Sequence, residues 1–164
     1  MVREYDPLVP LEVNDTRLTF RQTRHYIDTY SIRVEHGSAS VVYSGDTAPC
    51  DSLVDHAANC SLFLCEATLG LGREDGLRGH STAEEAGEMA RRAGAHRLVL
   101  THYGTTYAPD ELEEAAQSSF GGRVSVADDG VELSIEGASS AISARASDRR
   151  RMPRWQPEDT PKEA

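Results

Sequence analysis

Four acidic and imidazole side chains fall where predicted strands end or where a predicted helix begins. Asp46, Glu66 and His102 each follow a mainly apolar run that predicts a strand. His80 stands just before a sequence typical of a capped helix. Because ligands of open α/β sheets bind beyond the carboxyl ends of the strands, we expect these side chains to meet. Two carboxylates and two imidazoles in one place fit a metal site or an acid–base site.

Each of these residues also has a structural interpretation, which the sequence leaves open. Asp46, directly before a threonine, would only shape a turn, and His102 would be a hydrogen-bonded structural histidine. His80 would be an ordinary residue before a helix cap, and Glu66 would face solvent at a strand end. The functional interpretation therefore depends on all four occurring together.

The elements that position these groups alternate between strands and helices. Polar and apolar residues alternate over 17–22 and 31–35, as in half-buried strands, and His36-Gly37-Ser38 forms a tight turn into the next run. The predicted strands are 17–22, 31–35, 39–44, 61–65, 97–101, 124–127 and 131–135, and the predicted helices are 51–58, 82–93 and 109–118. This order predicts an α/β (α+β) fold in which helices cover a mixed sheet.

Two local signals set expected boundaries. Ser81 and Glu84 match a capping box at the start of the second helix, and Gly94 supplies its stop. Asp128-Asp129-Gly130, between 124–127 and 131–135, is typical of a hairpin turn. We therefore expect the last two strands to pair with each other.

Composition and charge narrow the function classes. The 164 residues suffice for one domain, with 38% hydrophobic residues and no apolar run long enough to span a bilayer. Without an apolar leader or a C-x-x-C pair among three cysteines, we expect a cytoplasmic protein with no membrane partner. We expect a domain over 1–136 and a disordered tail over 137–164. The domain carries a net charge of −12, which disfavours a broad nucleic-acid-binding face.

The remaining histidines and one cysteine receive structural interpretations. His36, His56 and His96 are expected to be surface residues. Cys65, which ends an apolar run beside Glu66, is expected to be buried and inert, with a thiol nucleophile as the minor alternative.

Four motifs follow one another in the order found in a known enzyme family. A histidine, His25, precedes an aromatic-x-[IV]-R-V strand at 30–34, S-G-D-T occupies 44–47, H-S-T occupies 80–82, and L-T-H occupies 100–102. Through these motifs, residues 10–135 resemble the C-terminal half of a metallo-β-lactamase-fold metallohydrolase, in the branch of ribonuclease Z and related phosphodiesterases. The resemblance implies half of an αββα sandwich.

The resemblance also implies roles for five side chains. Asp46 would bridge two metal ions, with His25 binding one ion and His102 the other. His80 would give a proton to the departing oxygen, and Glu66 would orient His80 or another ligand. Imidazole and carboxylate ligands suit one or two zinc ions, with manganese or iron as alternatives.

The sequence departs from the family pattern in two ways. The H-x-H-x-D-H motif of the family's N-terminal half is absent, so three ligands remain of an expected seven. Truncation or a misassigned start is the explanation that we favour. The alternatives are a homo-oligomer or a complementing chain that completes the sandwich, and a degenerate half-domain kept for interaction. The second departure concerns an arm with which ribonuclease Z grips tRNA. In that family the arm lies between two strands, and here only residues 35–40 lie between the corresponding strands.

Three functions remain in competition. The first is a metal-dependent hydrolase that uses a metal-activated water on a small phosphodiester or another ester. The second is a tRNase Z-like endoribonuclease, which the missing arm and the acidic domain disfavour. The third is a truncated or non-catalytic half-domain completed by another chain, for which metal content is the first discriminating measurement.

Overall fold

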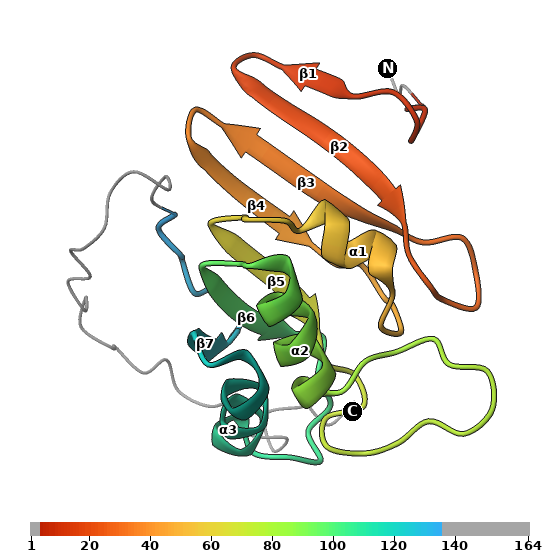
Figure 1. The fold of residues 1–164 in the computed structure, drawn as a ribbon, viewed down its shortest axis with the longest axis vertical. Coiled ribbons are helices and arrows are strands. Elements are labelled where there is room, and N and C mark those ends of the chain that lie inside the picture. Colours follow the sequence, from red (N-terminus) through yellow and green to blue (C-terminus); the bar gives the residue numbers. More distant parts are fainter. Residues whose placement is uncertain (1–3, 136–164) are drawn as a thin grey trace, which may run out of the picture.

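Seven short runs rich in β-branched and aliphatic residues pair in the order in which they occur along the chain. The computed structural model describes residues 4–135, and it joins these runs in one mixed sheet (Figure 1). The strands are β1 (Leu11–Val13), β2 (Thr16–Gln22), β3 (Tyr30–His36), β4 (Ala39–Tyr43), β5 (Leu62–Glu66), β6 (Arg97–Thr101) and β7 (Arg123–Val126).

The sheet changes from antiparallel to parallel at β4. Strands β1 to β4 form an antiparallel meander, in which His36 pairs with Ala39 across a tight turn. Strands β4 to β7 are parallel neighbours. Each parallel pair requires a crossover, and these crossovers contain the three helices α1 (Asp51–His56), α2 (Ala83–Ala93) and α3 (Pro109–Phe120).

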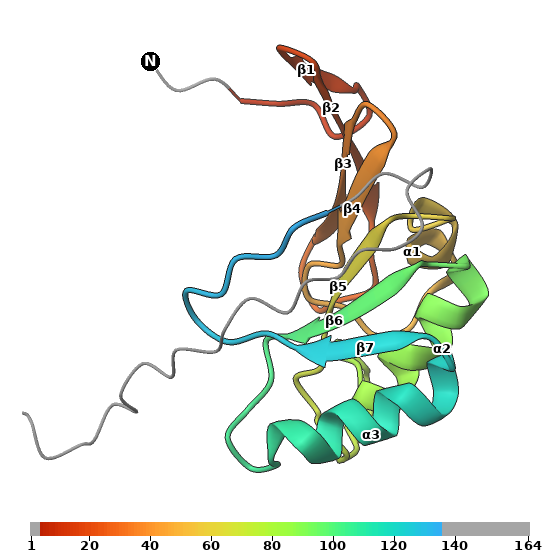
Figure 2. The same cartoon turned by 90° about the vertical axis from the view of Figure 1, so that its left-hand side faces the viewer.

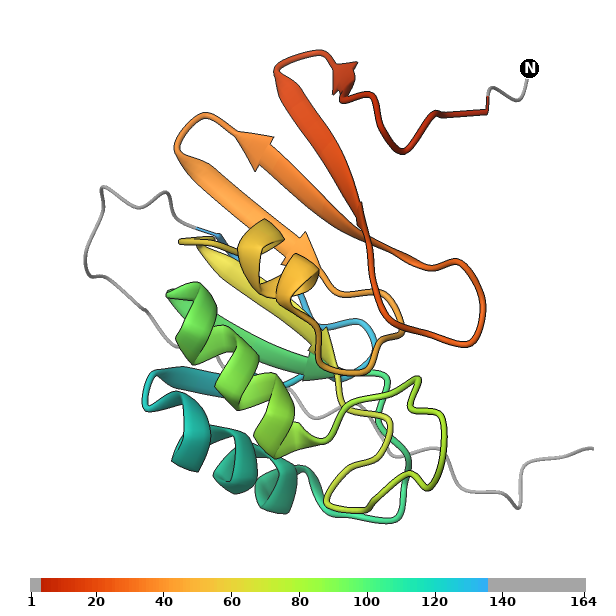
Figure 3. The same cartoon turned by 45° about the vertical axis from the view of Figure 1, so that its right-hand side comes forward.

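The three helices cover the same face of the sheet (Figure 3). Right-handed crossovers that all advance in one direction along a sheet place their helices on one side. The core between the layers contains Val42, Phe63 and Leu98 from the strands, all fully buried, against Leu53 and Met89 from the helices. Helices α2 and α3 approach closely at Gly87, where a Cβ atom would lie 2.4 Å from the Ala116 carbonyl oxygen.

The opposite face of the sheet carries no helix among residues 4–135. The segment after β7 turns back along this face, as the view from the side shows (Figure 2). The mixed sheet with helices on one face confirms the predicted fold class. Residues 137–164, predicted to be a disordered tail, lie outside the described residues. No helix of the described part of the chain is long and apolar enough to cross a membrane.

Two predictions of element boundaries were wrong, and one strand was missed. Residues 131–135 form no strand although β7, among the described residues, pairs only with β6 and keeps its other edge open, because Val131 and Ile135 lie exposed and this run buries no apolar face. The capping box lies one residue later than predicted, with Thr82 as the N-cap and Glu85 as its partner, because Ser81 instead donates to the Thr47 carbonyl oxygen. The short strand β1 was not predicted.

Candidate metal centre

The carboxyl ends of β4, β5 and β6 meet at one edge of the sheet, as parallel pairing requires. The loop between β2 and β3 joins this edge through an isolated bridge between Arg24 and Ala48. The Ala48 amide donates to the Arg24 carbonyl oxygen at 2.7 Å, and the Arg24 amide donates to Thr47 Oγ1 at 3.1 Å. Two loops far apart in the sequence are thereby fixed side by side.

Asp46 and His102 contact each other at this edge. The Nδ1 atom of His102 lies 2.9 Å from Asp46 Oδ1, and the side chains are 50% and 34% exposed. His102 has a φ of +50°, a left-handed conformation that is uncommon for a residue other than glycine and concentrates at functional sites. Thr68 Oγ1 donates to the His102 carbonyl oxygen at 3.1 Å and holds this turn. Both side chains therefore remain open to solvent on a restrained backbone.

Glu66 is fully buried and holds His80. Its Oε1 atom accepts the Thr47 amide at 2.7 Å and lies 2.9 Å from His80 Nδ1, and its Oε2 atom accepts the Thr68 amide at 2.9 Å. The alternative that Glu66 faces solvent at a strand end is thus wrong, because the following loop and the His80 loop close over it. With Nδ1 bound to Glu66, Nε2 is the His80 nitrogen left for chemistry.

His25 is oriented in the same manner by a backbone carbonyl. Its Nδ1 atom lies 2.8 Å from the Gly79 oxygen. A carbonyl oxygen can only accept, so Nδ1 carries the proton and Nε2 keeps its lone pair. Histidines that bind metals commonly donate their other ring N–H to a carboxylate or a carbonyl group in this way. Gly79 is required here, because a Cβ atom would lie 2.9 Å from His25 Nδ1 and 2.5 Å from the Tyr26 ring.

The structure brings the five predicted site residues into one cluster. The ring centroids of His25 and His80 are 4.8 Å apart, and those of His80 and His102 are 6.2 Å apart. Asp46 joins the cluster through His102, and Glu66 joins it through His80. The expectation that these groups meet at the carboxyl ends of the strands therefore agrees with the geometry, while their chemical roles stay a prediction.

The donor atoms fit a metal ion in type and in orientation, and they fall short in number. Imidazole nitrogen and carboxylate oxygen are ligands that zinc accepts, and His25 has its second nitrogen free. Within residues 4–135, however, no three side chains of His, Cys, Asp or Glu are arranged so that they hold an ion together. A catalytic zinc site has three protein ligands and a water molecule. The cluster thus supplies part of such a site.

Two other ionisable groups near the cluster stay neutral at physiological pH. Burial raises the pKa of Tyr43 above 10.0, and the neighbouring Asp46 and Glu66 carboxylates raise it further. Burial also raises the pKa of the Cys65 thiol far above its usual value, and Glu66 adds to this effect. Because the thiolate is the nucleophilic form of cysteine, this geometry disfavours Cys65 as a nucleophile.

One of the histidines expected on the surface is buried. His56 is only 8% exposed, with Nδ1 at 2.7 Å from Ser31 Oγ and Nε2 at 2.9 Å from Thr19 Oγ1. The prediction was wrong because α1 lies directly on β2 and β3, which turns this helix face toward the sheet. His36 and His96 are exposed, as predicted.

Sequence reasoning missed several groups that hold the cluster together. Thr47 is fully buried and connects its own loop to the end of β5 through Glu66, to the β2–β3 loop through Arg24 and to the loop before α2 through Ser81. Glu74 accepts two consecutive backbone amides beside His80. The position of Thr47 directly after Asp46 is a signal that could have been used, whereas no local pattern distinguishes Glu74 from the surface acids around it.

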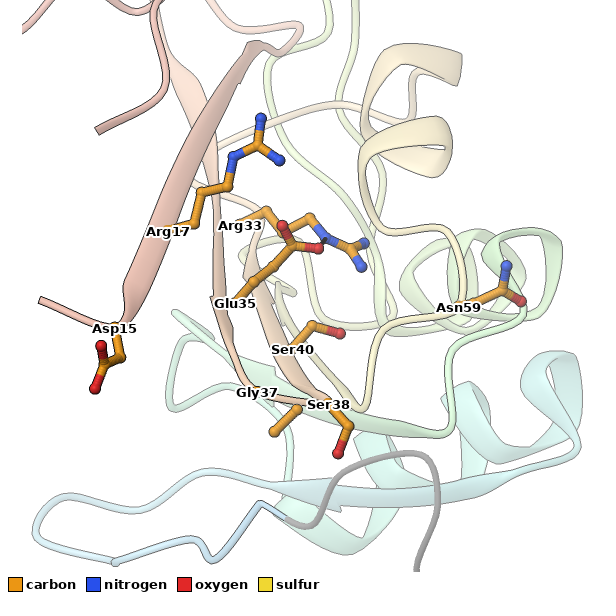
Figure 4. Close-up of a pocket in the computed structure, with 9 residues that line it drawn as sticks. Asp15, Arg17, Arg33, Glu35, Gly37, Ser38, Ser40 and Asn59 are labelled. Carbon is orange, nitrogen blue, oxygen red and sulfur yellow. Dashed lines mark hydrogen bonds and ion pairs between the residues drawn. The ribbon is translucent and has the colours of Figure 1, made fainter. Parts of the chain in front are cut away.

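A polar recess lies at the opposite end of β4, near the turn between β3 and β4 (Figure 4). Its Arg33 guanidinium is engaged by Glu35 at 2.9 Å and by the carbonyl oxygens of His56 and Ala58, each at 3.0 Å. This arginine therefore ties α1 to the sheet. The residues that line the recess are Asp15, Arg17, Arg33, Glu35, Gly37, Ser38, Ala39, Ser40 and Asn59.

Comparisons with known proteins place this geometry in a family. A family model described as a beta-lactamase superfamily domain matches residues 6–103. The probable metallo-hydrolase YhfI of Bacillus subtilis is 32% identical over 126 residues, which are 77% of this chain and 52% of that protein. Its crystal structure superposes with a TM-score of 0.73 over 77% of this chain and 53% of that one.

A second relative has a name that states an activity. Ribonuclease Z of Haloarcula marismortui is 41% identical over 99 residues, which are 58% of this chain and 32% of that protein. The chain thus spans about half, or less, of the length of the curated relatives described here.

Proposed function

This chain belongs to the metallo-β-lactamase superfamily of hydrolases, and from that premise we propose that its histidine cluster is part of a metal-dependent phosphodiesterase site. The observation that carries the proposal is the pair of Glu66 and His80 beside three residues suited to bind metal. Such a site needs a group that gives a proton to the departing oxygen and a separate group that holds the electrophile.

His80 is the proton donor in this scheme. Glu66 binds Nδ1 and is itself fixed by the amides of Thr47 and Thr68, so the imidazole ring cannot rotate freely. The proton that is transferred therefore belongs to Nε2. His80 is 18% exposed on its side chain, which shields it from bulk water while leaving it accessible to a substrate.

His25, Asp46 and His102 are the metal ligands of the proposal. A bound divalent ion lowers the pKa of a coordinated water and neutralises charge on phosphoryl oxygens. These ligands suit one or two zinc ions, and manganese or iron ions suit them as well. Because these residues do not by themselves enclose an ion, the proposal assigns the missing ligands to a complementing chain, a second copy of this chain or a longer form of the protein.

A small phosphodiester is the substrate class that we favour. Residues 1–136 carry a net charge of −12, which repels a polyanion at long range. The turn between β3 and β4 is tight, with His36 paired to Ala39, so no long arm for gripping RNA emerges there. A cytoplasmic location belongs to the same proposal and is supported by three free cysteines, Cys50, Cys60 and Cys65.

A second candidate is an endoribonuclease of the ribonuclease Z type. It is supported by the 41% identity to a protein of that name. Cleavage of a precursor tRNA, with binding that weakens steeply as salt increases, would favour this candidate over the first. No interaction with tRNA at low salt would exclude it.

Zinc titration of the 164-residue chain, followed by NMR of the histidine side chains, tests the site. We expect zinc to shift the His25 and His102 resonances and to leave His36 and His96, which are exposed elsewhere, unchanged. Once a complementing chain, a second copy or a longer form supplies the missing ligands, hydrolysis of bis(4-nitrophenyl) phosphate should depend on zinc and be lost in Asp46→Ala. Equal shifts at all four histidines, or unchanged hydrolysis in Asp46→Ala, would contradict the proposal.

A further inference from the structure

Glu74 makes an unusual pair of contacts beside the cluster. Its Oε2 atom accepts the backbone amide of Gly79 at 2.8 Å and that of His80 at 3.1 Å. Nothing in the metal or proton chemistry described above requires this residue. It stands in the loop between β5 and α2, among the charged residues that precede the histidine.

One peptide group connects Glu74 to a second histidine. The N–H of His80 and the C=O of Gly79 belong to the same peptide unit. The N–H side faces Glu74, and the C=O side accepts His25 Nδ1 at 2.8 Å. We propose that Glu74 is a positioning residue that sets His25 and His80 together, through the peptide group between Gly79 and His80. The inference rests on the proposed function only in treating these histidines as site residues.

The physical reason is the polarisation of a peptide group. An anion at the N–H draws positive charge to that side and increases the negative charge on the carbonyl oxygen, since hydrogen bonds in a chain reinforce one another. The Gly79 carbonyl is then a stronger acceptor for His25 Nδ1–H. The arrangement is equivalent to a carboxylate that binds a metal-ligating histidine directly, with a peptide inserted between the two. Its effect is to keep the lone pair on His25 Nε2.

The loop around this peptide is itself restrained. Arg78 makes a two-pronged ion pair with Glu85, with both N···O distances at 2.7 Å, and donates to the His80 carbonyl oxygen at 3.2 Å. Glu85 also accepts the Thr82 amide in the capping box of α2. The backbone of His80 is thus held at its N–H by Glu74 and at its C=O by Arg78, on a loop tied to the start of a helix.

Glu74 is charged at neutral pH. Partial desolvation alone would raise the pKa of this carboxyl group. The amides of Gly79 and His80, followed by the charges of His80 and Arg78, outweigh that effect and bring the pKa below its usual value. The carboxylate is therefore available as an anionic acceptor across the physiological range.

The matched variants are Glu74→Ala, Glu74→Gln and Asp75→Asn. Asp75 is the exposed neighbouring acid and makes no hydrogen bond to the described residues, so Asp75→Asn removes a charge from the same loop without touching the peptide. Each metal-free 164-residue chain is measured at neutral pH in two ways. Hydrogen exchange reports the Gly79 and His80 amides, and side-chain ¹⁵N NMR reports which ring nitrogen of His25 carries the proton.

In the wild-type chain we expect the Nδ1–H form of His25 to dominate. Glu74→Ala should speed exchange of both amides by about ten-fold or more, as the loss of a hydrogen bond to a charged group implies, and should mix the two His25 tautomers. Asp75→Asn should leave both measurements at the wild-type values. Glu74→Gln keeps an acceptor oxygen without its charge, so it should lie between Glu74→Ala and the wild type.

Three results would overturn the inference. One is unchanged exchange in Glu74→Ala, and another is faster exchange with an unaltered His25 tautomer. The third is an Asp75→Asn variant that behaves as Glu74→Ala does. If the alanine variant does not fold, Glu74→Gln decides the matter, and wild-type values in both measurements would count against Glu74. Neither readout depends on zinc or turnover, so a failure here is separate from a failure of the proposed phosphodiesterase activity.

Discussion

Protonation of His56 should weaken the packing of α1 on the sheet and lower the free energy of unfolding. Ser31 Oγ donates to the Arg21 carbonyl oxygen at 3.2 Å, so the His56 ring donates from Nδ1 to Ser31 and accepts from Thr19 at Nε2. This neutral ring satisfies every partner. A second ring proton would face the Thr19 hydroxyl in a buried site, and the Thr19 hydroxyl proton would have to find another acceptor.

The structure gives the size of the effect. Burial, followed by the charges of Arg21 and Arg33, lowers the pKa of His56 from 6.5 to about 4. Between these two pKa values the unfolded chain binds a proton that the folded chain does not bind, so the free energy of unfolding falls as pH falls. The contribution of neutral His56 to the free energy of unfolding is complete at pH values above the pKa of this histidine in the unfolded chain. About 2.5 kcal/mol of that contribution is lost between about pH 7.5 and pH 4.5.

Urea unfolding at several pH values measures this contribution. The neutral variant His56→Gln removes the titrating group, so the free energy of unfolding of the wild type minus that of the variant isolates His56 from the carboxylates, which also titrate at low pH. We expect this difference to decrease by about 2.5 kcal/mol over the window. His96→Gln is the control, because His96 is exposed and has no side-chain hydrogen bond to the described residues.

A difference that stays constant with pH would refute the reasoning. It would mean that the ring charges in the folded chain at no cost, and that α1 does not depend on the neutral ring. The same dependence in His96→Gln would also contradict the assignment. The outcome bears on the site, because α1 begins at Asp51, directly after the loop that carries Asp46.

Three predictions concern the site itself. Asp46→Ala and His102→Ala should each weaken zinc binding by about 100-fold or more, measured by competition with a chelator, because even outer partners of ligands contribute about ten-fold. Gly79→Ala should destabilise the chain by about 1–3 kcal/mol in urea and displace the His25 resonances, because its Cβ atom would meet His25 Nδ1 at 2.9 Å. Glu66→Gln should cost about 2 kcal/mol of stability and lower the turnover of bis(4-nitrophenyl) phosphate by about 100-fold, because an NH₂ group would face a backbone amide. Wild-type values in any of these assays would contradict the role given to that residue.

The meeting of Asp46, Glu66 and His102 was predictable because it follows from topology. Glu66 ends β5, Asp46 and His102 closely follow β4 and β6, and parallel strands end at one edge of a sheet. His80 was placed near them because the helix that it precedes must begin close to that edge, where β5 ends, and then run back to the start of the next parallel strand. The position of His25 had no such basis in periodicity, and only the family resemblance indicated it.

What could not be predicted depends on contacts between loops. The burial of His56 follows from how α1 lies on β2 and β3, which a six-residue helix does not reveal in its own sequence. The capping box moved from Ser81 to Thr82 because Ser81 found a partner in Thr47, far away in the sequence. The hairpin around Asp128-Asp129-Gly130 did not form although β7 keeps a free edge within the described part of the chain, because Val131 and Ile135 after the turn lie exposed and bury no apolar face.

The sheet alone does not set the distance between the two histidines that face each other. His25 belongs to the loop between β2 and β3, and His80 belongs to the loop before α2, so no strand contains either residue. The Gly79–His80 peptide contacts the His25 ring through its carbonyl oxygen, and the His80 ring belongs to the residue that follows this carbonyl group. A change in the length or charge of the loop 69–79 should therefore move both rings together. A substitution inside β5 would instead act on Glu66 and, through it, on His80, whereas one inside β6 would act on His102. His25 and His102 thus respond to different parts of the chain, which makes their contributions separable by mutation.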